Sequence, residues 1–161
     1  MKYIITEKQS RLLEEPEKVL RVPPLSYFNN SWEILQKFLE RRGYPPYSIS
    51  GNLNFAETSI KCLGNLIRVG GFLDLYNTQI ESLGNLEHVG GYLTLYGTPI
   101  KSLGNLEHVG GYLSLQETPI ESLGNLEYVG HFLNIQDTPL SIIMSEDEIR
   151  SKVNVEGDIY L

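Results

Sequence analysis

The sequence predicts an α/β repeat solenoid: a parallel β-sheet of about six strands, with turns and 3-10 segments on its convex side, a helical N-terminal cap and a short C-terminal helix. Three observations lead to this prediction. The chain repeats itself every twenty residues over most of its length. Each repeat contains a Leu-x-Leu alternation, which is typical of a half-buried strand. The first forty-eight residues lie outside the repeat and carry helix signals.

Residues 1–48 are predicted to form the cap, because a solenoid otherwise exposes its first apolar coil to water. Residues 6–15 indicate one short helix. Asn30 is followed three residues later by Glu33, which is the spacing of a capping box and predicts a second helix. We expect Trp32, in that helix, to pack on the first coil.

Residues 49–161 are predicted to form the solenoid as one structural unit. When the sequence is aligned with itself at an offset of twenty residues, isoleucine aligns with isoleucine, leucine with leucine and valine with valine. The equivalent strands are expected to start near residues 51, 71, 91, 111, 131 and 157. The last interval has six extra residues, and Ser145 with Glu148 forms a capping box. A short helix is therefore expected over residues 146–152.

Repeated glycine and polar residues are assigned to the turns. The glycine pairs that precede the strands, such as Gly90-Gly91, are expected to allow positive φ. Threonine and asparagine each recur once per coil and are expected to satisfy backbone groups of neighbouring coils. These rows are Thr58, Thr78, Thr98, Thr118 and Thr138, and Asn65, Asn85, Asn105 and Asn125. We interpret both rows as structural.

The repeat core, L-x-L-x-x-T-x-I-x-x-L, resembles the leucine-rich repeat, with threonine where that family most often carries asparagine. The resemblance covers residues 49–161 and implies one parallel strand and one return turn per coil. A twenty-residue unit leaves too little chain for a convex helix. The glycine pairs also make the unit similar to receptor L-domain repeats. Residues 2–7, together with the short repeat, resemble small uncharacterised phage and bacterial proteins, which implies no activity.

The composition fits one cytoplasmic domain. Of the 161 residues, 41% are hydrophobic, which is enough for a packed core. A net charge of −7 removes the overall attraction to phosphate on which binding to nucleic acid and anionic membranes depends. The single cysteine, Cys62, excludes an intrachain disulfide and a thiolate metal cluster. The sequence contains no run of eighteen apolar residues and no secretory leader.

The absence of catalytic motifs predicts a protein that is not an enzyme and holds no cofactor. G-x-S-x-G, G-x-x-x-x-G-K-[ST] and H-E-x-x-H do not occur. A repeat array lines up like groups, whereas catalysis needs unlike groups to converge. His88 and His108 lie one coil apart beside Glu87 and Glu107, so a metal site remains an alternative to a solvated polar row.

The open, concave face of the strands carries the candidate site. Because the leucines of each Leu-x-Leu point inward, the residues that alternate with them point outward. Many of these residues are aromatic, and rings with hydroxyl groups are typical of interface anchors. The candidate partner-binding residues are Phe72, Asp74, Tyr76, Tyr92, Thr94, Tyr96, Tyr112, Ser114, Gln116, Phe132 and Asn134.

We therefore predict a non-catalytic module that binds another protein through this face. Three other interpretations stay open. The chain stops inside its last strand, and the unpaired edge would allow a structural protein to assemble as a homodimer. Tyr, Asn, Gln and Asp also stack on sugars and hydrogen-bond to them, as a carbohydrate-binding face would require. Finally, the rings would serve sheet stability alone if they only stack on one another.

Overall fold

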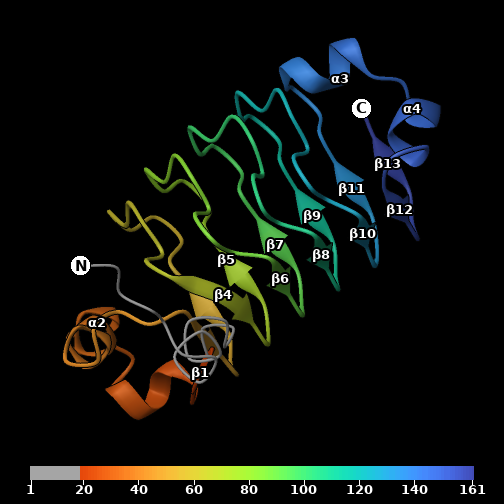
Figure 1. Cartoon of the computed structure of the whole chain (residues 1–161). Helices are drawn as coiled ribbons and strands as arrows, with labels where there is room; N and C mark the ends of the chain where they lie inside the picture. Colours follow the sequence, from red (N-terminus) through yellow and green to blue (C-terminus); the bar gives the residue numbers. More distant parts are fainter. Residues whose placement is uncertain (1–18) are drawn as a thin grey trace, which may run out of the picture.

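Each repeat forms one coil of a parallel β-solenoid, which confirms the prediction of a repeat solenoid built on parallel strands. The structure, a computed structural model, describes residues 19–161. The coils stack in sequence order and contribute strands to two parallel sheets (Figure 1). The few helices lie near the two ends of this described part. None of them is long and apolar enough to cross a membrane.

The first sheet contains the strands that the Leu-x-Leu pattern predicts. In spatial order its six strands are β13 (Ile159–Tyr160), β11 (Leu133–Asn134), β9 (Leu113–Ser114), β7 (Leu93–Thr94), β5 (Leu73–Asp74) and β3 (Leu53–Asn54). Each strand begins two residues after its predicted start. Leu73 pairs with Leu53 on one side and Leu93 on the other, so the repeat period is also the register of the sheet.

A second parallel sheet, absent from the sequence prediction, runs beside the first. Its seven strands are β1 (Leu20–Val22), β2 (Tyr47–Ile49), β4 (Leu66–Val69), β6 (His88–Val89), β8 (His108–Val109), β10 (Tyr128–Val129) and β12 (Asn154–Val155). The expectation of one strand and otherwise turns or 3-10 segments in each coil is therefore wrong. Within residues 19–161 the one 3-10 helix is η1 (Leu25–Phe28), outside the repeats. Backbone bonds between coils, such as Glu107 N–H to Glu87 O at 2.9 Å, hold this segment extended.

The third side of each coil forms no named strand in the described repeats. An isolated bridge joins Ser102 to Ser122 there. The hydroxyl oxygens of Ser82, Ser102 and Ser122 accept hydrogen bonds from the amide of the glycine two residues later, at 3.0, 3.1 and 3.0 Å. These bonds close the turn that leads back to the second sheet.

The threonine row closes turns within a coil, and the prediction that it bonds between coils is wrong. Thr98 Oγ1 donates to the carbonyl oxygen of Leu95, three residues earlier in the same coil, at 2.7 Å. The other members make the equivalent contact: Thr58, Thr78, Thr118 and Thr138. The asparagine row does reach backbone across coils, since Asn105 Nδ2 donates to the carbonyl oxygen of Gly84 at 3.4 Å. Asn85 Nδ2 donates to another side chain of the row, Asn65 Oδ1, at 3.4 Å.

The glycine pairs allow close approach of the coils and do not supply positive φ. Neither Gly90 nor Gly110 has a positive φ. A Cβ on Gly110 would collide with the carbonyl oxygen of Gly90, and a Cβ on Gly90 with that of Gly70. Positive φ occurs instead at the turn glycines, including Gly104 at 58°. The predicted role of the pairs is therefore wrong, and steric contact with the preceding coil is the physical reason for them.

Residues 19–48 are only partly helical. This described part of the predicted cap contains β1, η1, α2 (Trp32–Glu40) and β2, and its two strands join the second sheet. Trp32 packs edge-on against Phe55 of the first coil, with ring centroids 4.9 Å apart, as expected. The predicted helix over residues 6–15 lies outside the described residues.

Helix α2 has a different N-cap from the predicted one. Ser31 Oγ accepts a hydrogen bond from the Ile34 amide at 3.3 Å. Asn30 has a φ of 55° and lies one residue before the cap. An N-cap residue normally has an extended backbone, so the Asn30–Glu33 capping box is wrong.

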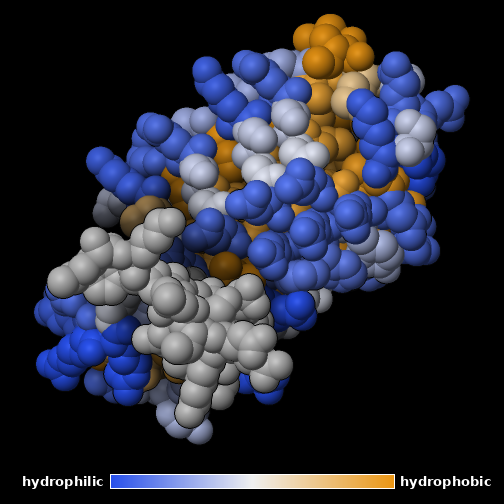
Figure 2. All heavy atoms as spheres, in the orientation of Figure 1, coloured by the Kyte–Doolittle hydropathy of each residue, from blue (hydrophilic) through white to orange (hydrophobic). Residues whose placement is uncertain are grey.

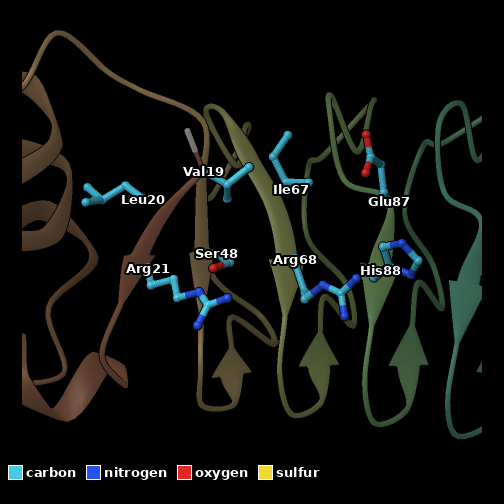
Figure 3. Close-up of a pocket in the computed structure, with 8 residues that line it drawn as sticks. All are labelled: Val19, Leu20, Arg21, Ser48, Ile67, Arg68, Glu87 and His88. Carbon is cyan, nitrogen blue, oxygen red and sulfur yellow. The ribbon is translucent and has the colours of Figure 1, made fainter. Parts of the chain in front are cut away.

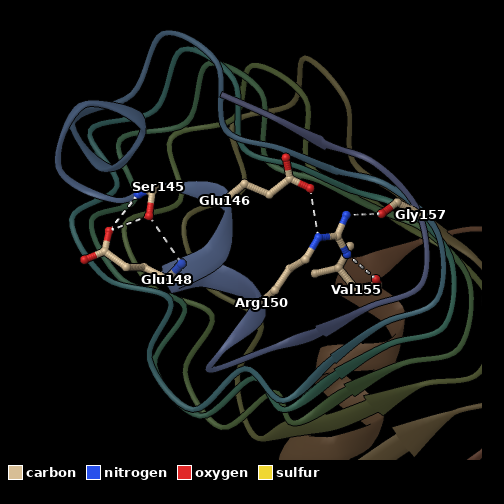
Figure 4. A network of polar contacts seen from close by, with 6 residues as sticks. All are labelled: Ser145, Glu146, Glu148, Arg150, Val155 and Gly157. Carbon is tan, nitrogen blue, oxygen red and sulfur yellow. Dashed lines mark hydrogen bonds and ion pairs between the residues drawn. The ribbon is translucent and has the colours of Figure 1, made fainter.

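The C-terminal end carries two short helices, α3 (Pro139–Ile143) and α4 (Glu146–Arg150), where the sequence predicts one. The capping box of α4 is confirmed, because Ser145 N–H donates to Glu148 Oε2 at 2.8 Å and Glu148 N–H donates to Ser145 Oγ at 3.3 Å (Figure 4). Arg150 then fastens α4 to the last coil. Its guanidinium donates to the carbonyl oxygens of Val155 at 2.8 Å and Gly157 at 2.9 Å.

Candidate functional site

Four of the predicted rings form a continuous stack on the outer side of the six-stranded sheet. We call Phe72, Tyr92, Tyr112 and Phe132 the aromatic column. Successive ring centroids lie 4.7, 4.8 and 4.8 Å apart, and the planes differ by 4°, 1° and 6°. Equivalent residues of adjacent parallel strands stand about 4.8 Å apart, so the register of the sheet imposes the stack. All four residues are half-buried.

Stacking decides which part of each ring reaches solvent. Tyr92 and Tyr112 have a neighbouring ring on both faces, so their edges and hydroxyl groups remain open. Burial raises the pKa of both hydroxyls, and the negative charge of Asp74 adds to the increase. Both groups are therefore protonated at neutral pH and can donate or accept a hydrogen bond.

The second column of predicted residues is engaged in its own turns. In Asp74, Thr94 and Asn134 a side-chain oxygen accepts a hydrogen bond from the backbone N–H two residues later, at 3.0, 3.5 and 3.0 Å. Ser114 occupies the same position in the intervening coil. These side chains therefore fix the turn that follows each strand. In Asp74 the bond uses Oδ1, and the other carboxylate oxygen takes no part in it.

A third column, made of Tyr76, Tyr96, Gln116 and Gln136, connects neighbouring coils. The rings of Tyr76 and Tyr96 stack with centroids 5.1 Å apart. The Tyr96 hydroxyl donates to the Glu117 carboxylate, which raises the pKa of Tyr96 to about 12. Gln116 Nε2 donates to Gln136 Oε1 at 3.3 Å. The structure thus brings all the predicted residues onto one face and adds Glu117 and Gln136. Gln136 is expected there because it lies twenty residues after Gln116. Nothing in the repeat indicates the bond from Tyr96 to Glu117.

A separate groove lies on the outer side of the seven-stranded sheet (Figure 3). It is lined by Val19, Leu20, Arg21, Ser48, Ile67, Arg68, Glu87 and His88. The register of β1, β2, β4 and β6 places Arg21, Ser48, Arg68 and His88 in one row. The groove mixes charges of both signs, and it contains none of the predicted partner-binding residues.

The histidine row continues beyond this groove. The rings of His88 and His108 are 5.8 Å apart, and His108 stacks on Tyr128 at 4.5 Å with 9° between the planes. His88 Nε2 lies 3.9 Å from a Glu107 carboxylate oxygen. Over residues 19–161, no three His, Cys, Asp or Glu side chains come together as metal ligands would.

Acidification should destabilise the protein through His108. Burial, His88 and Arg68 lower the pKa of His108 below its ordinary value of 6.5. Below that pH the unfolded chain binds the proton more readily than the folded protein, so stability falls until the pH drops below the folded pKa. We expect the melting temperature to fall as the pH is lowered through 6.5. It should fall less in His108→Tyr, which places at this position the residue that Tyr128 supplies in the next coil. Equal decreases would contradict this assignment.

An apolar patch covers α3 at the C-terminal end of the solenoid (Figure 2). Ile142 is 85% exposed and Ile143 is 66% exposed. A hollow beside them is lined by Gln136, Asp137 and Thr138 of the preceding turn, by Pro139, Ser141 and Ile142 of α3, and by Leu161. The sequence prediction does not include this patch, because it gives the extra residues of the last repeat to α4 alone.

The outer side of the six-stranded sheet, which we call the strand face, is therefore the surface that carries all the predicted partner-binding side chains. The α3 patch is a second exposed apolar region. The two surfaces differ in construction, since the first is built from ordered rows and the second from two isoleucines on a single turn of helix. Their interpretation rests on geometry alone, because no protein-family model, curated protein or solved structure matches the chain.

Proposed function

We propose that this chain is a non-catalytic module that binds another protein through the outer face of the six-stranded sheet. The aromatic column carries the proposal, because its central members Tyr92 and Tyr112 present ring edges and hydroxyl groups side by side. Such amphipathic rings are typical interface residues, and central ones are typical hot spots. The net charge of −7 favours a protein over nucleic acid or an anionic membrane as the partner. The proposal places the chain among leucine-rich-repeat-like proteins on the strength of its repeat sequence.

The stacking geometry disfavours a carbohydrate ligand. Aromatic residues bind sugars by offering a free ring face to the apolar side of the sugar. Inside the aromatic column both faces of Tyr92 and Tyr112 are covered by neighbouring rings. Tyr76 and Tyr96 also cover one face of each other. A polypeptide that contacts ring edges and hydroxyls suits this surface better.

Self-association through the C-terminal end is the second candidate function. The α3 patch exposes Ile142 and Ile143, and β13 pairs with β11 on one side only among the described strands. An apolar patch next to an unpaired strand edge is a typical association surface. A dimer that Ile142→Ser with Ile143→Ser dissociates would support this candidate, and a monomer at every concentration in size-exclusion chromatography would contradict it.

The hydroxyl groups of Tyr92 and Tyr112 can be removed without disturbing the stack, because Phe72 and Phe132 already occupy the equivalent positions. We expect Tyr92→Phe with Tyr112→Phe to keep the wild-type melting temperature and to lose roughly tenfold or more in affinity for the partner. Each hydrogen bond contributes about 0.5 to 1.5 kcal/mol, and about 1.4 kcal/mol is tenfold in affinity.

The measurement is affinity capture from cells that naturally produce the chain, followed by titration of the captured protein. Wild type, the double Phe variant and Lys101→Ala are compared, since Lys101 is exposed on the third side of the coil. If the double Phe variant binds as tightly as wild type, or Lys101→Ala loses as much affinity, the strand face is not the recognition surface.

A further inference from the structure

The strand face carries charge of one sign. The strands of the six-stranded sheet and their flanking turns comprise residues 50–58, 70–78, 90–98, 110–118, 130–138 and 156–161. These segments contain no lysine or arginine. They contain six acidic residues: Glu57, Asp74, Glu117, Asp137, Glu156 and Asp158. Within the described part of the chain, the segments that form this face therefore offer a ligand carboxylates and no lysine or arginine of their own.

The other two sides of the coil mix both signs. On the third side, four exposed residues of successive coils alternate in charge: Lys61, Glu81, Lys101 and Glu121. On the outer side of the seven-stranded sheet, Arg68 precedes Glu87 in the same groove. The single sign of the strand face is therefore a property of that face and does not follow from the net charge of −7 alone.

Three of the carboxylates stand at one corner, directly after the strands. Glu57, Glu117 and Asp137 have φ values of 58°, 55° and 58°. Left-handed backbone disfavours residues with a Cβ, and the middle coil uses Gly97 at this position with a φ of 68°. The corner is thus compatible with glycine, so its geometry does not require acidic side chains.

We propose that the partner segment of this face is a polypeptide stretch rich in lysine and arginine. The proposal rests on the proposed function and specifies the chemistry of its partner. Lysine and arginine donate charge-assisted hydrogen bonds to carboxylates such as Asp74 and Asp137, and they donate to tyrosine hydroxyls. Their aliphatic stems pack on ring edges, which are the parts that Tyr92 and Tyr112 leave open. Opposite charge also steers such a segment to the face.

The repeat supplies a neutral version of the face that the fold already accepts. Asp74→Asn keeps the turn bond, because Asn54 and Asn134 make it in other coils. Glu117→Asn and Asp137→Asn follow Asn77, which occupies the same left-handed corner. We call the triple substitution the neutral-face variant. Its matched control removes three charges elsewhere, through Glu81→Gln, Glu121→Gln and Glu127→Gln, all of which are exposed.

The test selects displayed random twelve-residue peptides on the immobilised full chain. We expect the enriched peptides to contain several-fold more lysine and arginine than the starting library. The same peptides, made synthetically, should bind the neutral-face variant at least tenfold more weakly than wild type and bind the control variant unchanged. Their affinity should also fall with added salt, because exposed charges are screened.

Two results overturn the proposal, and they differ in what they say about the proposed function. Enriched peptides that lose affinity for Tyr92→Phe with Tyr112→Phe, but are not rich in lysine and arginine or bind the neutral-face variant normally, overturn the cationic partner and leave the proposed function standing. A selection that enriches nothing, or only peptides indifferent to both face variants, overturns the two together.

Discussion

Replacing Gly110 with alanine is expected to destabilise the solenoid by about 3 kcal/mol, at the upper end of the usual cost of overpacking. The added Cβ collides with the carbonyl oxygen of Gly90, which belongs to the backbone and cannot rotate away. Relief requires the two coils to separate, and separation stretches the bond from Gly110 N–H to Val89 O, which is 2.8 Å long. The loss is measured as the change in free energy of unfolding in urea.

The control for this prediction is Gly104→Asn. Gly104 has a positive φ of 58°, but a Cβ there would meet nothing within 4 Å. Asparagine tolerates left-handed backbone, so we expect a cost of about 1 kcal/mol, at the low end for a residue other than glycine in this conformation. If Gly104→Asn costs as much as Gly110→Ala, the glycines act through backbone conformation and the explanation by close approach of the coils is wrong.

Truncating both central rings, through Tyr92→Ala with Tyr112→Ala, is expected to cost about 3 kcal/mol of stability. The double substitution removes all three stacked contacts of the aromatic column, and each contributes about 0.5 to 1.5 kcal/mol beyond the area that it buries. Loss of binding in this variant would therefore not by itself identify a binding residue. This is why the functional test uses phenylalanine, which retains the stack.

The comparison that checks this value is urea unfolding of the double Ala variant beside the double Phe variant and Tyr76→Ala. Tyr76 takes part in one stacked pair, so Tyr76→Ala should lose only about 1 kcal/mol. If the double Ala variant unfolds at the same urea concentration as wild type, the rings do not stabilise the sheet, and the column serves recognition alone.

The period of twenty predicts the first sheet because Leu-x-Leu marks a buried residue in the strand and a second one just after it, such as Leu73 and Leu75. The second sheet leaves a weaker signal, since β6 and β8 each bury one valine, Val89 or Val109, and no residue two positions away is buried. A single buried residue has no alternation, and the sequence therefore predicted turns. The prediction of positive φ at the glycine pairs is wrong for a related reason. Their role depends on contact with the backbone of the preceding coil, which the sequence of a single repeat does not indicate.

The rows of the candidate site follow from the sequence because a parallel register stacks equivalent residues. What the sequence does not contain is the direction that each side chain takes. The flat stacking of Tyr92 on Tyr112 depends on shared rotamers. The Asp74 carboxylate accepts a hydrogen bond from the Tyr76 amide, although the same oxygen could bond to water instead, and the sequence does not indicate which. The bond from Tyr96 to Glu117 joins a strand to the next corner and has no repeated counterpart that would indicate it.

The shared register of the two sheets gives this surface a property that most binding sites lack. Every coil enters and leaves at equivalent points, and Val109 lies directly between Val89 and Val129. A tandem duplication or deletion of one twenty-residue unit would therefore preserve both hydrogen-bond ladders and change the aromatic column by a single ring. The length of the binding surface is set by the number of repeats, whereas its selectivity is set by the three outward-facing positions of each repeat. The two can therefore change independently during evolution.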